Sequence, residues 1–368
     1  MYSQNDLDEA VAAGALSADQ ANALRAFIDR QRATPAVDEE QFRLITGFND
    51  IFVSIAAAIL LFAVGFIGQT VGQNMGLVIE RDGPSPIAPL FVAATSWGLA
   101  LFFTAKRRMA LPSILLLLAF VISVFAAVGF SLVVAIGGEP PADQEAIYAG
   151  VIASVSGAVA AGAAWLHWKR FRVPITIAAG ALAVSAILVG LLIAILGDPE
   201  NYQNLLLGFV LLLGIGVFLF AMRWDSSDPA RVTRRTDVAF WLHLLAAPMI
   251  VHPVFTLLGL NDNTATIGEG LVVIVLYVVI GLTALAIDRR ALLVSALAYV
   301  LYALNELFRQ FGAVELNVAL TALVIGSSLL LLSAFWHQAR SIVVRRLPTG
   351  LQGKLPYLDR EPIPAPAA

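Results

Sequence analysis

The dominant pattern along the chain is a series of long apolar stretches separated by short polar segments. After a polar N-terminal segment, ten apolar stretches follow, each of roughly 17–25 residues and so able to cross a hydrocarbon core about 30 Å thick. A helix is the expected form, because it satisfies its backbone hydrogen bonds internally. The stretches lie near residues 50–72, 87–105, 110–136, 146–166, 173–196, 204–222, 237–260, 269–287, 291–311 and 314–336. The pattern predicts an all-α, polytopic membrane helix bundle of about ten transmembrane helices.

Composition agrees with this prediction. Of the 368 residues, 59% are hydrophobic and 13% are charged, whereas soluble globular domains have about 25% charged residues. The absence of cysteine excludes disulfides, thiolate metal sites and cysteine nucleophiles. The four histidines lack metal-ligand spacing, and the sequence has no glycine-rich nucleotide loop or nucleophile motif. We therefore expect no cofactor and no metal, and we expect that the chain is not an enzyme.

Basic residues fall almost entirely on one side of the predicted topology. With the N-terminus in the cytoplasm, 21 of the 23 Lys and Arg residues lie in cytoplasmic segments, and only Arg81 and Arg309 lie on the other side. Cytoplasmic loops of membrane proteins carry such an excess. The sequence therefore predicts that both termini are cytoplasmic. Three regions follow: a cytosolic helical hairpin and linker at 1–49, a transmembrane bundle at 50–336, and a basic, proline-containing cytoplasmic tail at 337–368.

The N-terminal segment has the pattern of two short helices. Gly14 stands where the first helix should end, and Ser17 with Gln20 forms a capping-box sequence that should begin the second. Residues 1–49 contain eight acidic residues and four arginines, so nucleic acid is not an expected partner. We expect residues 1–35 to dock a cytosolic protein instead.

Three segments near the ends of the chain look familiar: residues 6–30 (DLDEAVAAGALSADQANALRAFIDR), residues 42–50 (FRLITGFND) and the tail from Trp336 to Leu358. They resemble a family of uncharacterised bacterial multi-spanning inner-membrane proteins. In that family a small cytosolic helical hairpin precedes a bundle of hydrophobic helices, and the family is a domain of unknown function. The resemblance implies a multi-pass protein of the bacterial inner membrane and implies no activity.

Polar side chains gather on one face of the stretch at 291–311. At 100° per residue, Tyr299, Tyr302, Glu306 and Arg309 fall within an arc of about 100°. One interpretation is a wall of a substrate or proton path, because polar groups at membrane depth need a partner or a cavity. The other is that Glu306 and Arg309 neutralise each other at i and i+3 while the tyrosines pack between helices.

The stretch at 237–260 contains two prolines, Pro248 and Pro253. Each lacks an N–H, so the carbonyls of Leu244 and Met249 should lose their usual partners and the helix should kink. Free carbonyls at a kink can act as ligands where they line a cavity. The alternative is a packing kink, with His252 as a neutral hydrogen-bonding residue.

His252 and Glu306 lead to a more specific hypothesis. Counted from the cytoplasmic ends of their helices, both side chains should lie about 22 Å deep. A histidine and a desolvated carboxylate at one depth could relay protons. The sequence does not show whether the two helices touch.

Small residues recur at every fourth position of the stretch at 146–166. Gly150, Ser154, Ala158 and Gly162 form this stripe, which permits close helix approach. Its partner is either another span of the same chain or a second copy of the protein, as in a homo-oligomer.

Three functions remain after these observations. The first is a membrane-embedded accessory or scaffold protein with a cytosolic docking hairpin. The second is a secondary transporter or flippase whose polar path is lined by the seventh and ninth spans. An intramembrane enzyme is the least favoured, because such chemistry needs several converging reactive groups.

Overall fold

The chain forms two compact units, Met1–Phe42 with Asp359–Ala368, and Arg43–Leu358. We call the second of these unit 2. The computed structural model describes residues 11, 13–14, 16–23, 48–79, 83–138, 140–141, 144–229, 231, 233–259, 267–290, 292–294, 297, 300–301 and 317–358.

The described part of the N-terminal segment confirms the expected turn and capping box. Gly14 has a φ of +73°, a conformation that glycine adopts without a steric penalty. The side chain of Gln20 accepts a hydrogen bond from the Ser17 N–H at 3.0 Å, and the Ser17 hydroxyl accepts one from the Gln20 N–H at 3.2 Å. A helix begins directly after Ser17, as reciprocal capping predicts.

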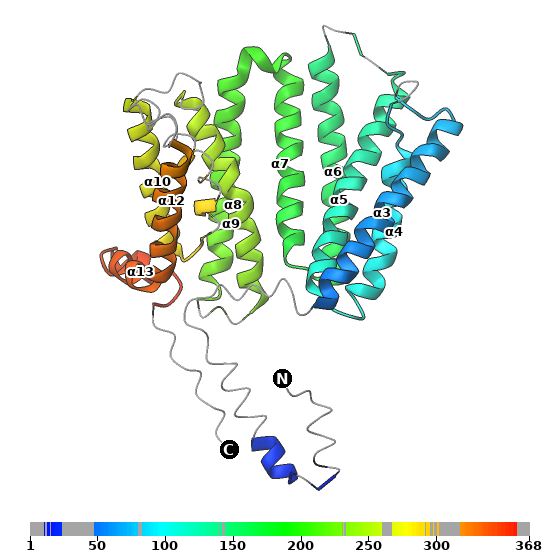
Figure 1. Cartoon of the computed structure of the whole chain (residues 1–368). Helices are drawn as coiled ribbons and strands as arrows, with labels where there is room; N and C mark the ends of the chain where they lie inside the picture. The colour runs from blue at the N-terminus through cyan, green and yellow to red at the C-terminus, as the bar shows by residue number, and fades with distance from the viewer. Residues whose placement is uncertain are drawn as a thin grey trace. The chain divides into compact units, whose positions relative to one another are not determined.

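Every regular element of the described residues in unit 2 is a helix (Figure 1). The elements are α3 (Phe48–Asn74), α4 (Ile87–Phe103), α5 (Ala110–Ala135), α6 (Glu145–Phe171), α7 (Ile175–Leu196), the 3₁₀ helix η1 (Pro199–Tyr202), α8 (Gln203–Ser226), α9 (Arg234–Leu257), α10 (Ile267–Ile287), α12 (Asn317–Ala334), α13 (Trp336–Arg345) and α14 (Thr349–Gln352). The helices α3 to α10 and α12 coincide with predicted stretches, whereas most of the stretch at 291–311 lies outside the described residues.

Six of these helical segments are long and apolar enough to cross a membrane: α3, α5, α6, α7, η1 with α8, and α9. The helix α4 is apolar but has 17 residues. Between α12 and α13 the helix axis bends by 74° at Phe335. The structure is therefore that of an all-helical protein with several transmembrane helices.

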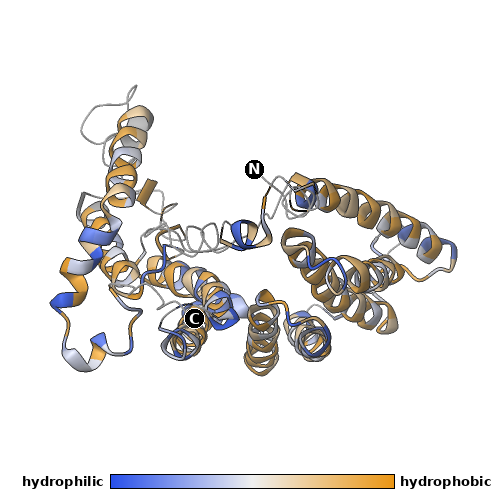
Figure 2. Cartoon of the chain, turned by 90° about the horizontal axis from the view of Figure 1, so that it is seen from below, coloured by the Kyte–Doolittle hydropathy of each residue, from blue (hydrophilic) through white to orange (hydrophobic). Residues whose placement is uncertain are grey.

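The surface of the helices suits a lipid environment. Large apolar side chains are left exposed along them, including Phe62 at 78%, Ile195 at 79% and Leu330 at 73%. Figure 2 shows that the helices are mainly hydrophobic along their length, with hydrophilic residues mostly in the turns between them. Such large apolar faces on a water-soluble monomer would be unusual.

Consecutive helices pack side by side, most extensively α6 on α7, followed by α8 on α9 and α4 on α5. Turns that carry Lys106, Arg172, Arg231 and Arg289 follow helices at one end of unit 2, which we call the basic end. The start of α3 and the helix α13 also lie at this end (Figure 1). Basic residues thus accumulate at one end of the bundle, as the loop charges predict.

The small-residue stripe of α6 packs against α7 of the same chain. A Cβ added at Gly150 would lie 2.5 Å from the Gly190 carbonyl oxygen and 2.5 Å from the Ala194 nitrogen. The Ser154 hydroxyl, which bonds to the carbonyl of Gly150, also lies 3.2 Å from the carbonyl of Ile187. Of the predicted partners, an adjacent span therefore covers the Gly150 end of the stripe.

The other end of the stripe is open. Ala158 and Gly162 are exposed, and a Cβ on Gly162 would meet no atom of the described residues within 4 Å. The α6–α7 contact therefore uses only one end of the stripe.

Candidate functional site

Buried charged residues join α8, α9 and α10 at the basic end. The carboxylate of Asp225, on the last turn of α8, accepts hydrogen bonds from Arg289 and lies 3.1 Å from His243 Nε2. All three residues are at most 1% exposed. We call Asp225, His243 and Arg289 the Asp225 cluster. Burying charges is tolerated only where they are paired and hydrogen-bonded, and in this cluster the opposite charges are in direct contact.

The turn after α10 positions the arginine of this cluster. Asp288 has a φ of +57°, its N–H bonds to the Leu285 carbonyl, and the next N–H, of Arg289, bonds to the Ala284 carbonyl at 2.9 Å. These are the two hydrogen bonds of a Schellman motif, with Asp288 at the position usually held by glycine. Aspartate is one of the few other residues that adopt this conformation.

The side chain of Asp288 forms a second group of buried interactions. It accepts hydrogen bonds from Arg231 Nη1 at 2.7 Å and from the indole Nε1 of Trp336 at 2.7 Å, and Arg340 Nε lies 3.7 Å away. We call Asp288, Arg231, Trp336 and Arg340 the Asp288 cluster. It connects the α8–α9 turn, the end of α10 and the start of α13.

Arg340 continues these connections into the C-terminal segment. Its guanidinium donates to the carbonyls of Pro356 at 2.6 Å and Tyr357 at 3.2 Å, and the arginine is 3% exposed. Leu355 belongs to the same buried apolar cluster as Trp336 and Val344. The chain up to Tyr357 is therefore held against the basic end of the bundle.

The charges of the Asp288 cluster keep its carboxylate ionised. Burial alone would raise the pKa of Asp288, but the charges of Arg231 and Arg340 and the Trp336 hydrogen bond hold it below its usual value. Burial, together with the charge of Arg289, lowers the pKa of Arg231 to about 10, against the attraction of Asp288. Both groups are therefore ionised near neutral pH.

A third carboxylate closes the α8–α9 turn. One oxygen of Asp228 accepts hydrogen bonds from the Thr233 N–H at 2.8 Å, the Thr233 hydroxyl at 2.6 Å and the Thr236 hydroxyl at 3.2 Å. Thr233 in turn caps α9, accepting from the Arg235 N–H. This arrangement satisfies donors at the start of α9 that the helix itself leaves unpaired.

The chemistry open to these clusters is limited by their burial. Nε2 of His243 faces Asp225, whereas Nδ1 has no hydrogen-bond partner among the described residues, and the ring packs edge-on against Phe218 at 5.2 Å. A general base must reach a substrate proton. Within the described part of the chain, no group of three or more His, Asp or Glu residues could hold a metal ion. The clusters are suited to holding helices together.

A second buried histidine lies in an aromatic environment between α4, α5 and α6. His167 is 1% exposed, and its ring lies 4.6 Å from Phe171, 6.0 Å from Phe120 and 6.1 Å from Trp97 between centroids. Its Nδ1 lies 3.3 Å from the Thr176 hydroxyl. Such tight aromatic packing makes His167 a core residue of this part of the bundle.

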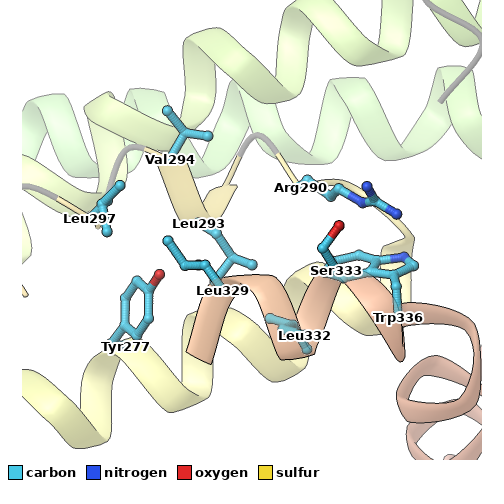
Figure 3. A pocket seen from close by; sticks show the side chains of 9 residues that line it. All are labelled: Tyr277, Arg290, Leu293, Val294, Leu297, Leu329, Leu332, Ser333 and Trp336. Carbon is cyan, nitrogen blue, oxygen red and sulfur yellow. The ribbon is translucent and has the colours of Figure 1, made fainter. Parts of the chain in front are cut away.

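An apolar pocket lies between α10, α12 and the residues that follow α10 (Figure 3). Its volume is about 130 Å³. Leucine and valine side chains form most of its wall, and Arg290, Ser333 and Trp336 lie at one end and Tyr277 toward the other (Figure 3). The lining residues are Tyr277, Arg290, Leu293, Val294, Leu297, Leu329, Leu332, Ser333 and Trp336.

The predicted polar face of the ninth span cannot be compared with this geometry. Tyr299, Tyr302, Glu306 and Arg309 all lie outside the described residues. His252 is exposed on α9, where its carbonyl accepts a hydrogen bond from Thr256 at 2.9 Å. The pairing of His252 with Glu306 therefore stays a hypothesis.

The two prolines lie within α9, which runs as one helix from Arg234 to Leu257. Pro248 is exposed and Pro253 is buried. The carbonyl of Met249, which Pro253 cannot bond, packs against Gly214 of α8: a Cβ on that glycine would lie 2.9 Å from the carbonyl oxygen. This proline thus contributes to close packing of α8 on α9.

The sequence patterns did not single out the residues of the Asp225 and Asp288 clusters as a site. One signal could have found them. Asp225, Asp228 and Asp288 are acidic residues at the ends of predicted spans, in turns that otherwise carry arginine. An acidic residue in such a turn weakens positive-inside bias only slightly, but it provides a partner for a buried arginine.

Comparison of the chain with protein-family models, with curated proteins and with solved structures found no match.

Proposed function

We propose that the chain is a membrane-embedded accessory or scaffold protein of a bacterial inner membrane, with about ten transmembrane helices and both termini in the cytoplasm. The bundle anchors the chain in the bilayer, and the cytoplasmic segments hold a soluble protein partner, with residues 1–35 as the docking element. The concentration of 21 of 23 basic residues on one side supports this orientation.

The observation that supports this proposal best is that the buried charged groups at the basic end are paired with one another. The charged groups of the Asp225 cluster bind one another, and Asp288 binds Arg231 and Trp336. A transport path needs polar groups that exchange partners with a passing solute or with water. Groups that are buried and mutually paired fix helices in place instead.

The same clusters give the cytoplasmic side a fixed shape. The segment from Trp336 to Tyr357 is held against α8, α9 and α10 through Asp288, Arg340 and the apolar cluster around Leu355. A surface that is already ordered loses less conformational entropy when a partner binds. A rigid cytoplasmic side is therefore consistent with a docking role.

Cross-linking in intact cells followed by purification of the full chain tests this function. Three forms are compared: the wild type, a form without residues 1–35, and Ala21→Pro, which removes the hydrogen bond from the Ala21 N–H to the Ser17 carbonyl. Asp19→Asn, at an exposed position of the same helix, is the matched control. We expect one partner to be captured by the wild type and the control and lost from the other two forms. An unchanged partner set would argue strongly against the docking hairpin.

The second candidate is a secondary transporter or flippase, favoured by the two prolines within α9 and by the polar pattern of the ninth span. Its test compares the wild type with Glu306→Gln. If His252 and Glu306 relay protons, intrinsic tryptophan fluorescence or transport should titrate with pH in the wild type and lose this titration in the variant. Identical pH curves would remove the pair and this path from consideration.

A further inference from the structure

The pocket beside α10 has the shape of a slot with unlike ends. Leu293, Leu297, Leu329 and Leu332 supply its side walls, and the polar groups of Arg290 and Ser333 lie near Trp336 at one end (Figure 3). The side walls contribute no hydrogen-bonding group. Polar solutes bind where several polar groups converge, so an apolar occupant fits these walls better.

Trp336 positions the guanidinium of Arg290 at the charged end of the pocket. The guanidinium carbon of Arg290 lies 4.9 Å from the centroid of the Trp336 ring, within the range of a cation–π interaction. The indole N–H is already held by Asp288, so the ring that faces Arg290 has a defined orientation. A guanidinium in this position suits a phosphate group, which it binds through two parallel hydrogen bonds.

The Trp336 end of the pocket lies at the bend between α12 and α13, which is near the lipid headgroups if α12 spans the bilayer as in the proposed function. Trp336 begins α13, which turns by 74° away from the end of α12. A helix nearly perpendicular to a transmembrane helix runs along the membrane surface. The outer sides of α13 carry exposed Ile342 at 55% and exposed Arg345 and Arg346, the mixture typical of an interfacial helix.

The size of the pocket limits what it can hold. Its volume of about 130 Å³ is similar to that of an engineered apolar cavity, about 150 Å³, that binds benzene. This volume fits a segment of one hydrocarbon chain.

We propose that this pocket binds an anionic phospholipid, with the phosphate at Arg290 and a segment of one acyl chain between α10 and α12, pointing toward Tyr277. The acyl chain fills an apolar slot, and the guanidinium over Trp336 pairs with the headgroup. The exposed Arg345 and Arg346, at the other end of the helix that Trp336 begins, add positive charge on the same side and favour a lipid with net negative charge over a zwitterionic one.

Tryptophan quenching by brominated lipids tests the proposal. The full chain is reconstituted in vesicles of a zwitterionic phospholipid, and brominated phosphatidylglycerol or brominated phosphatidylcholine is titrated in. Bromine quenches tryptophan on contact, so Trp336 reports occupancy of the pocket. Both lipids carry the phosphate, but phosphatidylcholine adds a trimethylammonium charge that the guanidinium of Arg290 repels. We therefore expect half-maximal quenching at about a tenfold lower mole fraction of the anionic lipid. Trp336→Phe should remove this high-affinity component.

Two pairs of variants localise the effect. Arg290→Gln should bring the two lipids to within about twofold of each other, while Arg290→Lys should keep part of the preference. Leu329→Phe, which fills part of the slot without adding a tryptophan, should abolish the saturable component for both lipids. Leu331→Phe, exposed on the same helix at 59%, should leave it unchanged. Thermal unfolding and circular dichroism of every variant establish that it is folded.

Two results would overturn the proposal. One is an unchanged anionic preference in folded Arg290→Gln or in Trp336→Phe, which would place the preference elsewhere, such as near exposed Trp165 and Lys169. The other is quenching of Trp336 by brominated free fatty acid with no response to brominated phosphatidylglycerol. That result would assign the slot to a soluble amphiphile instead.

Discussion

Among single residues, Asp225 has the most demanding environment of the described carboxylates. It is 1% exposed and bound by Arg289, which is also 1% exposed, while His243 Nε2 lies 3.1 Å from the same Oδ2 that accepts from Arg289 Nε. A buried ion pair adds little net stability compared with apolar residues of the same shape, but the loss of one partner is costly because the other charge stays buried. The same reasoning applies, less strongly, to the half-buried Asp288.

Asp225→Ala should therefore destabilise the protein strongly. We expect the free energy of unfolding in detergent to fall by about 3–5 kcal/mol, because Arg289 loses its carboxylate in a buried site. Chemical denaturation followed by circular dichroism measures this change. Asp198→Ala is the control, since Asp198 only caps the exposed helix η1, and it should cost about 1 kcal/mol or less. Equal effects of the two variants would contradict the assigned burial of the pair.

The Asp288 cluster predicts a pH dependence of C-terminal docking. The folded-state pKa of Asp288 lies below its ordinary value of 3.8, so its ionised form stabilises the fold fully at higher pH. This contribution is lost as pH falls below about 4 through the lowered pKa. Because the chain has no cysteine, Leu355→Cys provides a single buried probe. Its maleimide labelling after brief incubation should stay slow from pH 7 to 5 and increase after incubation below pH 4.

The matched variant for this experiment is Asp288→Asn. It removes the titrating carboxylate, so labelling at Leu355→Cys should be faster at neutral pH and should lose its acid transition. An acid transition that persists unchanged in Asp288→Asn would assign the pH dependence to another group.

At the level of secondary structure elements, close approach of glycine-containing helices determines how the bundle packs. Gly150 on α6 and Gly190 on α7 face each other so closely that an added Cβ at either would come within 2.6 Å of backbone atoms of the opposite helix. Gly214 has the same role where α8 meets the Met249 carbonyl of α9. Between lipid-embedded helices, such close packing replaces the hydrophobic driving force that water would supply.

Gly150→Ala and Gly162→Ala should have opposite effects. The first places a Cβ against backbone that cannot move aside without separating α6 from α7, and we expect it to cost about 1–3 kcal/mol of stability. The second adds a methyl group in open space within a helix, where alanine is favoured over glycine by about 1 kcal/mol. Thermal unfolding in detergent distinguishes them. Equal midpoints for both variants would show that α6 and α7 are not in close contact.

At the scale of the whole molecule, the proposed orientation places the basic end in the cytoplasm. Lys106, Arg289 and the helix α13 belong to that end, whereas the α7–η1 turn lies at the opposite end of unit 2 (Figure 1). The proposed functions depend on this orientation, because the docking segment and the lipid pocket must both face the cytoplasmic side.

Single cysteines introduced into the cysteine-free chain measure this orientation. We expect Lys106→Cys and Arg345→Cys to be protected from a membrane-impermeant maleimide in intact cells and labelled after lysis. Asp198→Cys, in the opposite turn, should be labelled in intact cells once the reagent has crossed the outer membrane. Labelling of Lys106→Cys and Arg345→Cys from different sides would contradict both the span count and the proposed topology.

Much of the helical framework could be predicted from the sequence alone. Nine of the ten apolar stretches coincide with helices, α3 to α10 and α12, and the capping box of Ser17 and Gln20 is present as expected. These features depend on residues close together in the chain, namely the length of an apolar run and the spacing of a cap. The distribution of arginine and lysine likewise predicted a common side for the turns, because it needs only the order of the spans.

The tertiary structure decided which charges meet and which helix faces are covered. Asp225 and Arg289 are 64 residues apart, and their pairing depends on how α8 and α10 are rotated about their axes. The spacing of small residues on α6 did not show which helix covers them. On α9 the sequence pattern pointed to His252, whereas the buried and paired histidine is His243. Hydrophobicity cannot assign helix rotation when nearly every face is apolar. Close packing at small residues sets that rotation, and with it the ion pairs and the pocket.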